Sequence, residues 1–220
     1  MEAPRVFISM GTPFTEQYAK FRDELETLLR DRCGVNPRII GKNEYPSGSP
    51  LSHIREVMRE CHGVVVVAYE RTFLESGIEK RGGPTETNIN KRAYTTPWNH
   101  IESAIAYSLS LPLYILCQHE LTEEGLIESK VDWYVQYVDL LPGVLSKPEI
   151  SESIRSWVNS RVIPQARKPR RLQALLGGLK LSEMTPNELL VLVGTFSATF
   201  LLGAGAAAFF PNFVALITHH

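Results

Sequence analysis

The stretch from Thr95 to Leu116, TTPWNHIESAIAYSLSLPLYIL, holds the residue best placed to do chemistry, the carboxylate of Glu102. Pro97 is favourable in the first turn of a helix, because the N–H that proline lacks has no helical partner there. A helix that starts at Pro97 puts Glu102 in its early turns, above the end of the preceding strand. A carboxylate there can act as a base, a nucleophile or an electrostatic partner of an oxocarbenium-like sugar cation. The plainer alternative is a surface glutamate that is favoured by the helix dipole.

A second group of candidates follows the first apolar strand pattern, Arg5–Met10 (RVFISM). Its members are small, hydroxylated or aromatic: Ser9, Gly11, Thr12 and Phe14. A hydroxyl can donate to phosphate or ribose, a glycine permits a turn, and an aromatic ring can stack on a base. Ligands of open α/β sheets bind outside the carboxyl ends of the strands, which is where this group falls. The alternative is a plain strand-to-helix turn with Thr15 as the N-cap residue.

Two further aromatic residues are candidates. Trp98 can form a wall of the pocket, and a half-buried packing role fits it equally well. Tyr45 lies in the turn-rich loop Asn43–Pro50 (NEYPSGSP), where it is a candidate lid contact.

Residues 5–117 alternate strand and helix signals, which is typical of a parallel sheet with crossover helices. Helices are predicted over Thr15–Arg32, Leu51–Cys61, Pro97–Ser110 and Ser151–Ile163. Strands are predicted over Arg5–Met10, Pro37–Gly41, Gly63–Tyr69 and Leu113–Gln118, whereas Val131–Leu140 fits either element. The continuous β-branched run of Gly63–Tyr69 indicates a strand covered on both faces. Arg71–Thr96, with its glycines, mixed charges and few apolar residues, is predicted to be a long, mobile insertion.

Two of these segments resemble TIR domains. Val6–Ser9 (VFIS) resembles their opening strand, and Thr96–Glu102 (TPWNHIE) resembles the TIR motif S-x-W-x-x-x-E. In NAD-cleaving TIR domains this glutamate is catalytic, so the resemblance implies a catalytic Glu102 and NAD or a related nucleotide as substrate or ligand. The loop around Tyr45 takes the place of the TIR loop that closes over the nucleotide. Asn99 stands where the family has a cysteine, and it joins the nucleotide-binding candidates.

The same helix is similar to that of nucleoside 2-deoxyribosyltransferases, in which E-x-G-x-A precedes a proline ten residues after the nucleophilic glutamate. The residues at these offsets are Glu102, Ala104, Ala106 and Pro112. SMGTPF (Ser9–Phe14) resembles the first phosphate-side loop of that family, although its Asp-Gly-Thr is missing here. Both relatives have a Rossmann-like fold and act on N-glycosidic bonds. The resemblance, over residues 5–118, implies the same fold and chemistry for this chain.

Composition excludes several other classes of protein. The 220 residues are 44% hydrophobic and 21% charged, which excludes a disordered chain. Lys and Arg total 23 and Asp and Glu 24, so the net charge is −1 and no nucleic-acid partner is expected. Three scattered cysteines with no CxxC pair predict neither a disulfide framework nor a metal site. No cofactor is expected beyond the nucleotide itself.

The C-terminal region has a different composition. Leu189–Phe210 (LLVLVGTFSATFLLGAGAAAFF) is uncharged, and no charged residue follows up to Ile217. About 20 apolar residues span the ~30 Å hydrocarbon core of a bilayer. The residues upstream include a basic cluster: Arg167, Lys168, Arg170, Arg171 and Lys180. This cluster suits anionic lipid, and the positive-inside rule places the N-terminal domain in the cytoplasm. The alternative is a helix buried inside a soluble oligomer.

The predicted organisation is therefore a TIR-like nucleotide-handling domain over residues 1–163, a basic linker over 164–188 and a single transmembrane segment over 189–217. Two functions fit it. One is a membrane-anchored effector of prokaryotic antiviral or abortive-infection defence that cleaves the N-glycosidic bond of NAD or a related nucleotide. The other is a non-catalytic nucleotide-sensing or assembly domain whose oligomerisation drives membrane disruption by the C-terminal helix. Homo-oligomers are expected in both, and the sequence leaves open whether the domain is an enzyme.

Overall fold

A parallel β-sheet forms the centre of the fold. The computed structural model describes residues 2–45, 48–128 and 133–167. Within them the sheet has five strands in the order β2-β1-β3-β6-β7, and every neighbouring pair is parallel. The strands are β1 (Arg5–Met10), β2 (Asn36–Arg38), β3 (Gly63–Ala68), β6 (Leu113–Cys117) and β7 (Tyr134–Tyr137). The predicted α/β fold with a parallel sheet flanked by helices is confirmed.

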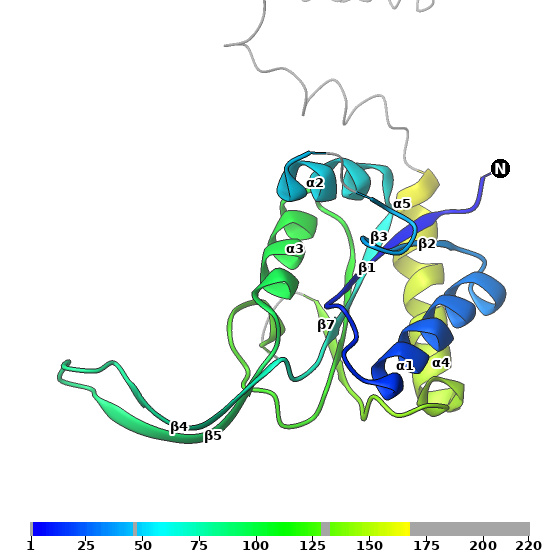
Figure 1. Ribbon diagram of the computed structural model, residues 1–220. Coiled ribbons are helices and arrows are strands. Elements are labelled where there is room, and N and C mark those ends of the chain that lie inside the picture. The colour runs from blue at the N-terminus through cyan, green and yellow to red at the C-terminus, as the bar shows by residue number, and fades with distance from the viewer. Residues whose placement is uncertain (1, 46–47, 129–132, 168–220) are drawn as a thin grey trace, which may run out of the picture. The chain divides into compact units, whose positions relative to one another are not determined.

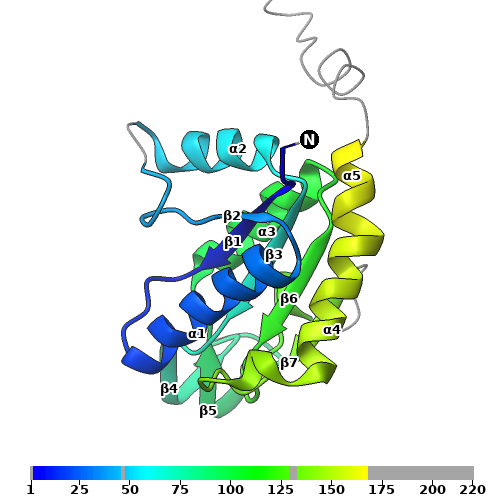
Figure 2. The same ribbon diagram turned by 90° about the vertical axis from the view of Figure 1, so that its right-hand side faces the viewer.

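Helices cover both faces of this sheet (Figures 1 and 2). One face carries α1 (Glu16–Thr27), α4 (Pro148–Trp157) and α5 (Ile163–Arg167). The other face carries α2 (Pro50–Glu60) and α3 (Pro97–Ser108). Single π-helical turns at Leu28–Arg32 and Val158–Val162 continue α1 and join α4 to α5. Each face has its own apolar core, because alternate strand residues point to opposite sides.

The strand alternation decides which residue of β1 meets which helix. Val6 and Ile8 belong to the core under α1 and α4, whereas Phe7 belongs to the core under α2 and α3. Ser9 follows Phe7 at the two-residue period and therefore lies on the α3 face. All residues of β3 are buried, which confirms the prediction of a strand covered on both faces.

The chain between β3 and α3 differs from its prediction. It forms a two-stranded antiparallel hairpin, β4 (Thr72–Glu79) and β5 (Thr87–Tyr94), paired from Thr72↔Tyr94 to Glu79↔Thr87. This hairpin, the arm, extends away from the sheet in Figure 1. Arg71–Thr96 is therefore an insertion between β3 and α3, as predicted, but the prediction did not include the two paired strands that it contains. A two-stranded ribbon in water needs few apolar residues, so the sparse apolar content concealed its strands.

Smaller differences concern the ends of elements. The last predicted helix begins at Pro148 rather than at Ser151, because proline fits the first helical turn. The ambiguous Val131–Leu140 contains the strand β7. The second strand is Asn36–Arg38, shorter than the predicted Pro37–Gly41. The three cysteines are free thiols.

The predicted C-terminal span, residues 189–217, lies outside the described residues. Of the predicted linker, residues 164–167 continue the last helix, and the remainder also lies outside the described part. Among the residues that the structure does describe, no helix has the length and apolar content needed to cross a bilayer.

Gly63, at the start of β3, is packed too closely to accept a side chain. A Cβ atom there would lie 2.8 Å from a methyl group of Val162 and 3.0 Å from the ring of Trp157. Gly63→Ala is expected to lower the free energy of unfolding by about 2 kcal/mol, because a well-packed core resists added volume. Urea unfolding measures this, with Gly48→Ala as the control, since nothing lies within 4 Å of its added Cβ. Equal stability of the two variants would contradict the packing described here.

Candidate functional site

Glu102 lies on the buried face of α3. The helix starts as predicted, with Pro97 in the first turn and the Thr96 hydroxyl accepting a hydrogen bond from the Trp98 N–H at 3.3 Å. Its buried residues recur at helical spacing: Asn99, Glu102, Ser103 and Ala106. Glu102 is only 8% exposed, so the alternative of a surface glutamate does not hold. A carboxyl group on the core side of a helix is rare unless it has a specific partner.

That partner belongs to a buried polar network between α3 and β1. The Asn99 side-chain amide donates to the Ser9 hydroxyl at 2.9 Å and to the Ser9 carbonyl at 3.2 Å. The Thr95 hydroxyl donates to the Asn99 side-chain oxygen at 2.8 Å. The Ser9 hydroxyl in turn interacts with the Glu102 carboxyl and lowers its pKa. Asn99 thus fixes the Ser9 hydroxyl, and Ser9 holds Glu102.

Burial changes the acidity of Glu102. Desolvation raises the pKa of its carboxyl group to about 7, and the hydrogen bond from Ser9 opposes this rise only in part. The group therefore exchanges its proton near neutral pH, as acid–base and nucleophilic carboxyl groups in active sites commonly do. Perturbed acidity together with a fixed hydrogen-bond partner makes Glu102 the strongest candidate for chemistry in this fold.

The loop after β1 borders the same edge of the sheet. Thr15 caps α1, as the alternative of a plain strand-to-helix turn predicts, since its hydroxyl accepts from the Tyr18 N–H at 3.2 Å. The Gly11 carbonyl accepts a hydrogen bond from the Tyr69 hydroxyl at 2.8 Å. A Cβ atom on Gly11 would lie 3.2 Å from that hydroxyl oxygen and 3.5 Å from the Thr96 methyl group. The loop therefore packs closely against the residue that follows β3 and against the cap of α3.

An aromatic cluster stands at this edge. The Tyr18 and Tyr69 ring centroids are 4.4 Å apart, and Phe14 lies 5.3 Å from Tyr18 and 6.0 Å from Tyr69. Phe14 remains 54% exposed, and the Arg71 guanidinium lies over its ring, 5.5 Å from the centroid. Tyr18, Tyr69 and Arg71 were not among the candidate site residues predicted from the sequence. Tyr69 is the last residue of the predicted strand Gly63–Tyr69, and Arg71 lies two residues beyond it, so the rule about carboxyl ends, applied to β3 as it was to β1, would have found them.

The strand order explains why these loops meet. From β1 the chain moves to β2 on one side, and it then returns to β3 on the other side. Such a reversal opens a crevice between the carboxyl ends of the two strands, where open α/β sheets bind ligands. The loop after β1 and the loop after β3 border this position, and Glu102 reaches β1 from α3.

The remaining sequence candidates lie at the surface. Trp98 is 43% exposed on the outer side of α3, and Thr12 is exposed in the loop after β1. Tyr45 is 69% exposed, and its hydroxyl donates to the Lys42 carbonyl at 2.6 Å. The structure thus joins Ser9, Asn99 and Glu102 in one network, places Gly11 and Phe14 beside it, and leaves Thr12, Tyr45 and Trp98 as exposed side chains.

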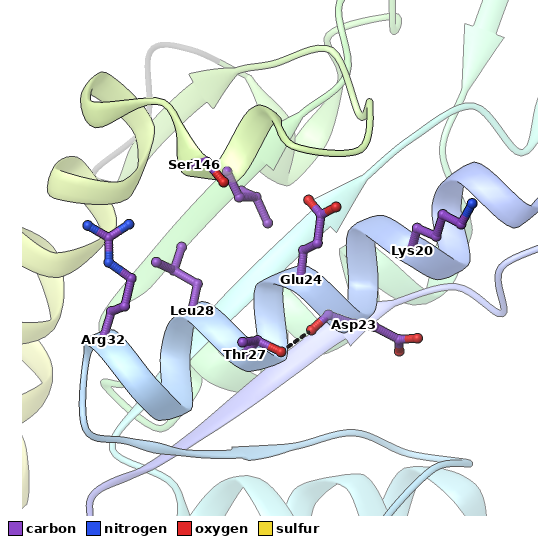
Figure 3. Close-up of a pocket in the computed structure, with 8 residues that line it drawn as sticks. Lys20, Asp23, Glu24, Thr27, Leu28, Arg32 and Ser146 are labelled. Atoms are coloured by element: carbon purple, nitrogen blue, oxygen red, sulfur yellow. Dashed lines mark hydrogen bonds between the residues drawn. The ribbon is translucent and has the colours of Figure 1, made fainter.

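Neither a metal cluster nor the groove beside α1 adds to this site. Over the described residues, no group of three His, Cys, Asp or Glu residues could hold a metal ion. An open groove of about 400 Å³ lies between α1 and Leu145–Ser146 (Figure 3). Its lining carries both signs of charge, and Glu24 there accepts from the Gly143 N–H at 2.8 Å. The groove lies on the α1 face, opposite Glu102, so it is separate from the network.

Comparisons with known proteins do not assign this chain to a family. No family model matches the chain, and no curated protein matches it. Among solved structures it is similar to the CMP N-glycosidase BcmB of Clostridium botulinum, with 17% identity and a TM-score of 0.39. That similarity covers 61% of this chain and 87% of the other. The proposed function therefore rests on the geometry of the site and on the sequence resemblance.

Proposed function

We propose that this domain binds a nucleotide at the carboxyl edge of β1 and β3 and cleaves its N-glycosidic bond, with Glu102 as the catalytic residue. The observation that carries the proposal is the buried Glu102 carboxyl, whose pKa is raised to about 7 and which the Ser9 hydroxyl holds in place. The class of enzyme is a nucleotide N-glycosidase, and NAD or a related nucleotide is the substrate that the sequence resemblance favours.

The chemistry of this bond suits a buried carboxylate. When the bond between ribose C1′ and the base nitrogen breaks, its electron pair leaves with the base, and positive charge develops on C1′ and the ring oxygen. The ionised Glu102 stabilises this cation or captures it as an ester, and water then adds at C1′. In a site that excludes water, the carboxylate stabilises this positive charge more strongly than it would in bulk water, because the local dielectric constant is lower. Only the ionised form of Glu102 can stabilise or capture the cation.

The direct test is incubation of the full chain with NAD, AMP and CMP, followed by chromatographic detection of the released base. We expect release that increases as pH rises from 6 to 8, because the ionised fraction of Glu102 grows through its pKa of about 7. A rate that falls over this range would instead assign Glu102 the role of general acid. Absence of base release from all three nucleotides, with and without nucleotide activators, would overturn the proposal.

A second function is favoured by one specific observation, the uncharged run of residues 189–217. A cleaving enzyme does not need a membrane, whereas a sensor that oligomerises and perturbs a bilayer does. In this version the cytosolic domain binds the nucleotide without turnover, homo-oligomers gather the C-terminal helices, and membrane damage is the toxic step of an antiviral defence. Cells killed by the protein while their NAD stays intact would favour this function over the first.

Membrane attachment can be tested by cell fractionation. We expect the full chain to fractionate with membranes and to resist extraction by high salt, because about 20 apolar residues bury stably in hydrocarbon. A chain that ends after Arg167 should remain in the supernatant. Full-length protein that is monodisperse without detergent would show that the apolar run packs inside an oligomer.

A further inference from the structure

Arg71 lies at the root of the arm, three residues after the end of β3 and directly before β4. Its backbone is fixed, since the Arg71 N–H donates to the Tyr94 carbonyl at 2.8 Å. The preceding Glu70 N–H donates to the Gln118 side-chain oxygen at 3.0 Å, and Gln118 directly follows β6. The side chain of Arg71, in contrast, is exposed. Arg71 therefore has a fixed backbone and an exposed guanidinium, an arrangement that suits binding of a ligand from solution.

Arg71 forms no ion pair within the described residues. Several other cations of the chain pair with carboxylates: Arg5 with Glu2 and Glu60, Arg38 with Glu44, and Lys42 with Asp23 and Glu26. Arg71 has no such partner in the described part of the chain, where its recorded side-chain contact is the ring of Phe14. An aromatic ring holds a guanidinium by cation–π attraction without accepting its N–H hydrogen bonds. The planar donors of Arg71 therefore stay available for a bidentate anion.

Arg71 and Glu102 face the same carboxyl edge from different elements. Tyr69 is two residues from Arg71 and contacts Gly11, and Gly11 is two residues from Ser9, which holds Glu102. These contacts link Arg71, through Tyr69 and the loop after β1, to Ser9 and Glu102 at the same edge of the sheet. A ligand that fits both groups has a sugar at Glu102 and an anionic group at Arg71.

We propose that Arg71 is the phosphate-binding residue of this site and that the ligand is a phosphorylated nucleoside rather than a free nucleoside. The proposal rests on the proposed function only for the position of the sugar at Glu102. Phe14 is then a positioning residue that holds the guanidinium through its ring. This differs from the base-stacking role predicted for Phe14, because the Arg71 guanidinium lies over that ring and Tyr18 and Tyr69 contact it.

Equilibrium binding tests the proposal without requiring turnover. The full chain and its variants are titrated calorimetrically with AMP and CMP, and with adenosine and cytidine, at low and high salt. We expect the wild-type protein to bind the monophosphates at least 10-fold more tightly than the nucleosides. Arg71→Gln should weaken monophosphate binding 10-fold to 100-fold and leave nucleoside binding unchanged. Arg71→Lys should recover part of the loss, because it restores the charge but not the bidentate geometry.

Two controls separate binding from structural effects. Arg92→Gln removes an exposed arginine of the same arm and should leave every dissociation constant unchanged. Phe14→Leu should weaken monophosphate binding, and both site variants should keep the wild-type unfolding midpoint. An unchanged ratio of monophosphate to nucleoside affinity in Arg71→Gln overturns the proposal, as does a wild-type protein that binds no monophosphate.

The outcome is distinguishable from that of the proposed function. Arg71-dependent monophosphate binding without any base release would support the phosphate site and refute glycosidic cleavage. Base release that requires Glu102, combined with an unchanged affinity ratio in Arg71→Gln, would refute the phosphate site and leave cleavage standing.

Discussion

Glu102→Gln is expected to reduce the rate of glycosidic cleavage at least 100-fold while leaving the fold intact. The glutamine amide keeps the size of the side chain and can still accept the hydrogen bond of Ser9, but it carries no negative charge for the developing ribosyl cation. Loss of one preorganised electrostatic partner commonly costs about 3 kcal/mol of transition-state stabilisation, which is a factor of 100 or more in rate. Base release under saturating nucleotide measures the effect.

The matched control is Glu75→Gln, which removes an exposed carboxylate of β4. It should retain the wild-type rate, because an exposed charge on the arm is screened by solvent. In cells, loss of turnover and loss of toxicity should coincide in Glu102→Gln if cleavage is the toxic act. Toxicity that survives Glu102→Gln and disappears when Leu189–Phe210 is deleted would identify the membrane segment as the effector.

The same substitution is expected to stabilise the protein at alkaline pH. In the native state the pKa of Glu102 is about 7, against an ordinary value of 4.5. Below pH 4.5 the carboxyl is neutral in both native and unfolded chains, so its full contribution to stability is present. As pH rises through 7, the native chain must ionise a buried group, and that contribution is lost. The loss approaches about 3 kcal/mol above pH 8, at about 1.4 kcal/mol for each pKa unit.

Glu102→Gln removes this penalty because glutamine does not ionise. Urea unfolding should show the variant about 3 kcal/mol more stable than the wild-type protein at pH 8 and nearly equal to it at pH 4.5. A difference that does not depend on pH would mean that Glu102 does not titrate in this range. Higher stability joined to lower activity is the pattern expected of a residue kept for function at the expense of the fold.

The local sequence was sufficient to predict most strands of the central sheet. The β-branched run of β3 and the helix start at Pro97 are each determined by neighbouring residues, and both were predicted closely. The arm was not, because its strands are stabilised by cross-strand pairing across a turn rather than by burial of an apolar face. Leu74 and Ile89 approach each other over Gly77, a contact that no short window of sequence reveals.

The candidate site was predictable only in part, for a similar reason. Glu102 was found through its position after Pro97 and through its resemblance to known motifs. The interaction of Glu102 with Ser9 depends on how α3 packs over β1. These two elements lie about 90 residues apart in the chain. Asn99 was chosen from a motif, whereas its role as the donor that orients Ser9 follows from packing alone. The phosphate-binding proposal for Arg71 likewise depends on where β3 ends relative to β1.

The structure of the arm shows how the segment between β3 and α3 can vary in length without changing the rest of the fold. The hydrogen bond from the Arg71 N–H to the Tyr94 carbonyl closes the hairpin at its root, so its two ends leave the domain side by side. Residues inserted or removed beyond that root therefore do not change the distance that the chain must span between β3 and α3. The entropic cost of a longer loop grows only with the logarithm of its length. Related chains can thus lengthen or shorten this hairpin, and acquire new binding surfaces on it, while Glu102 keeps its place against β1.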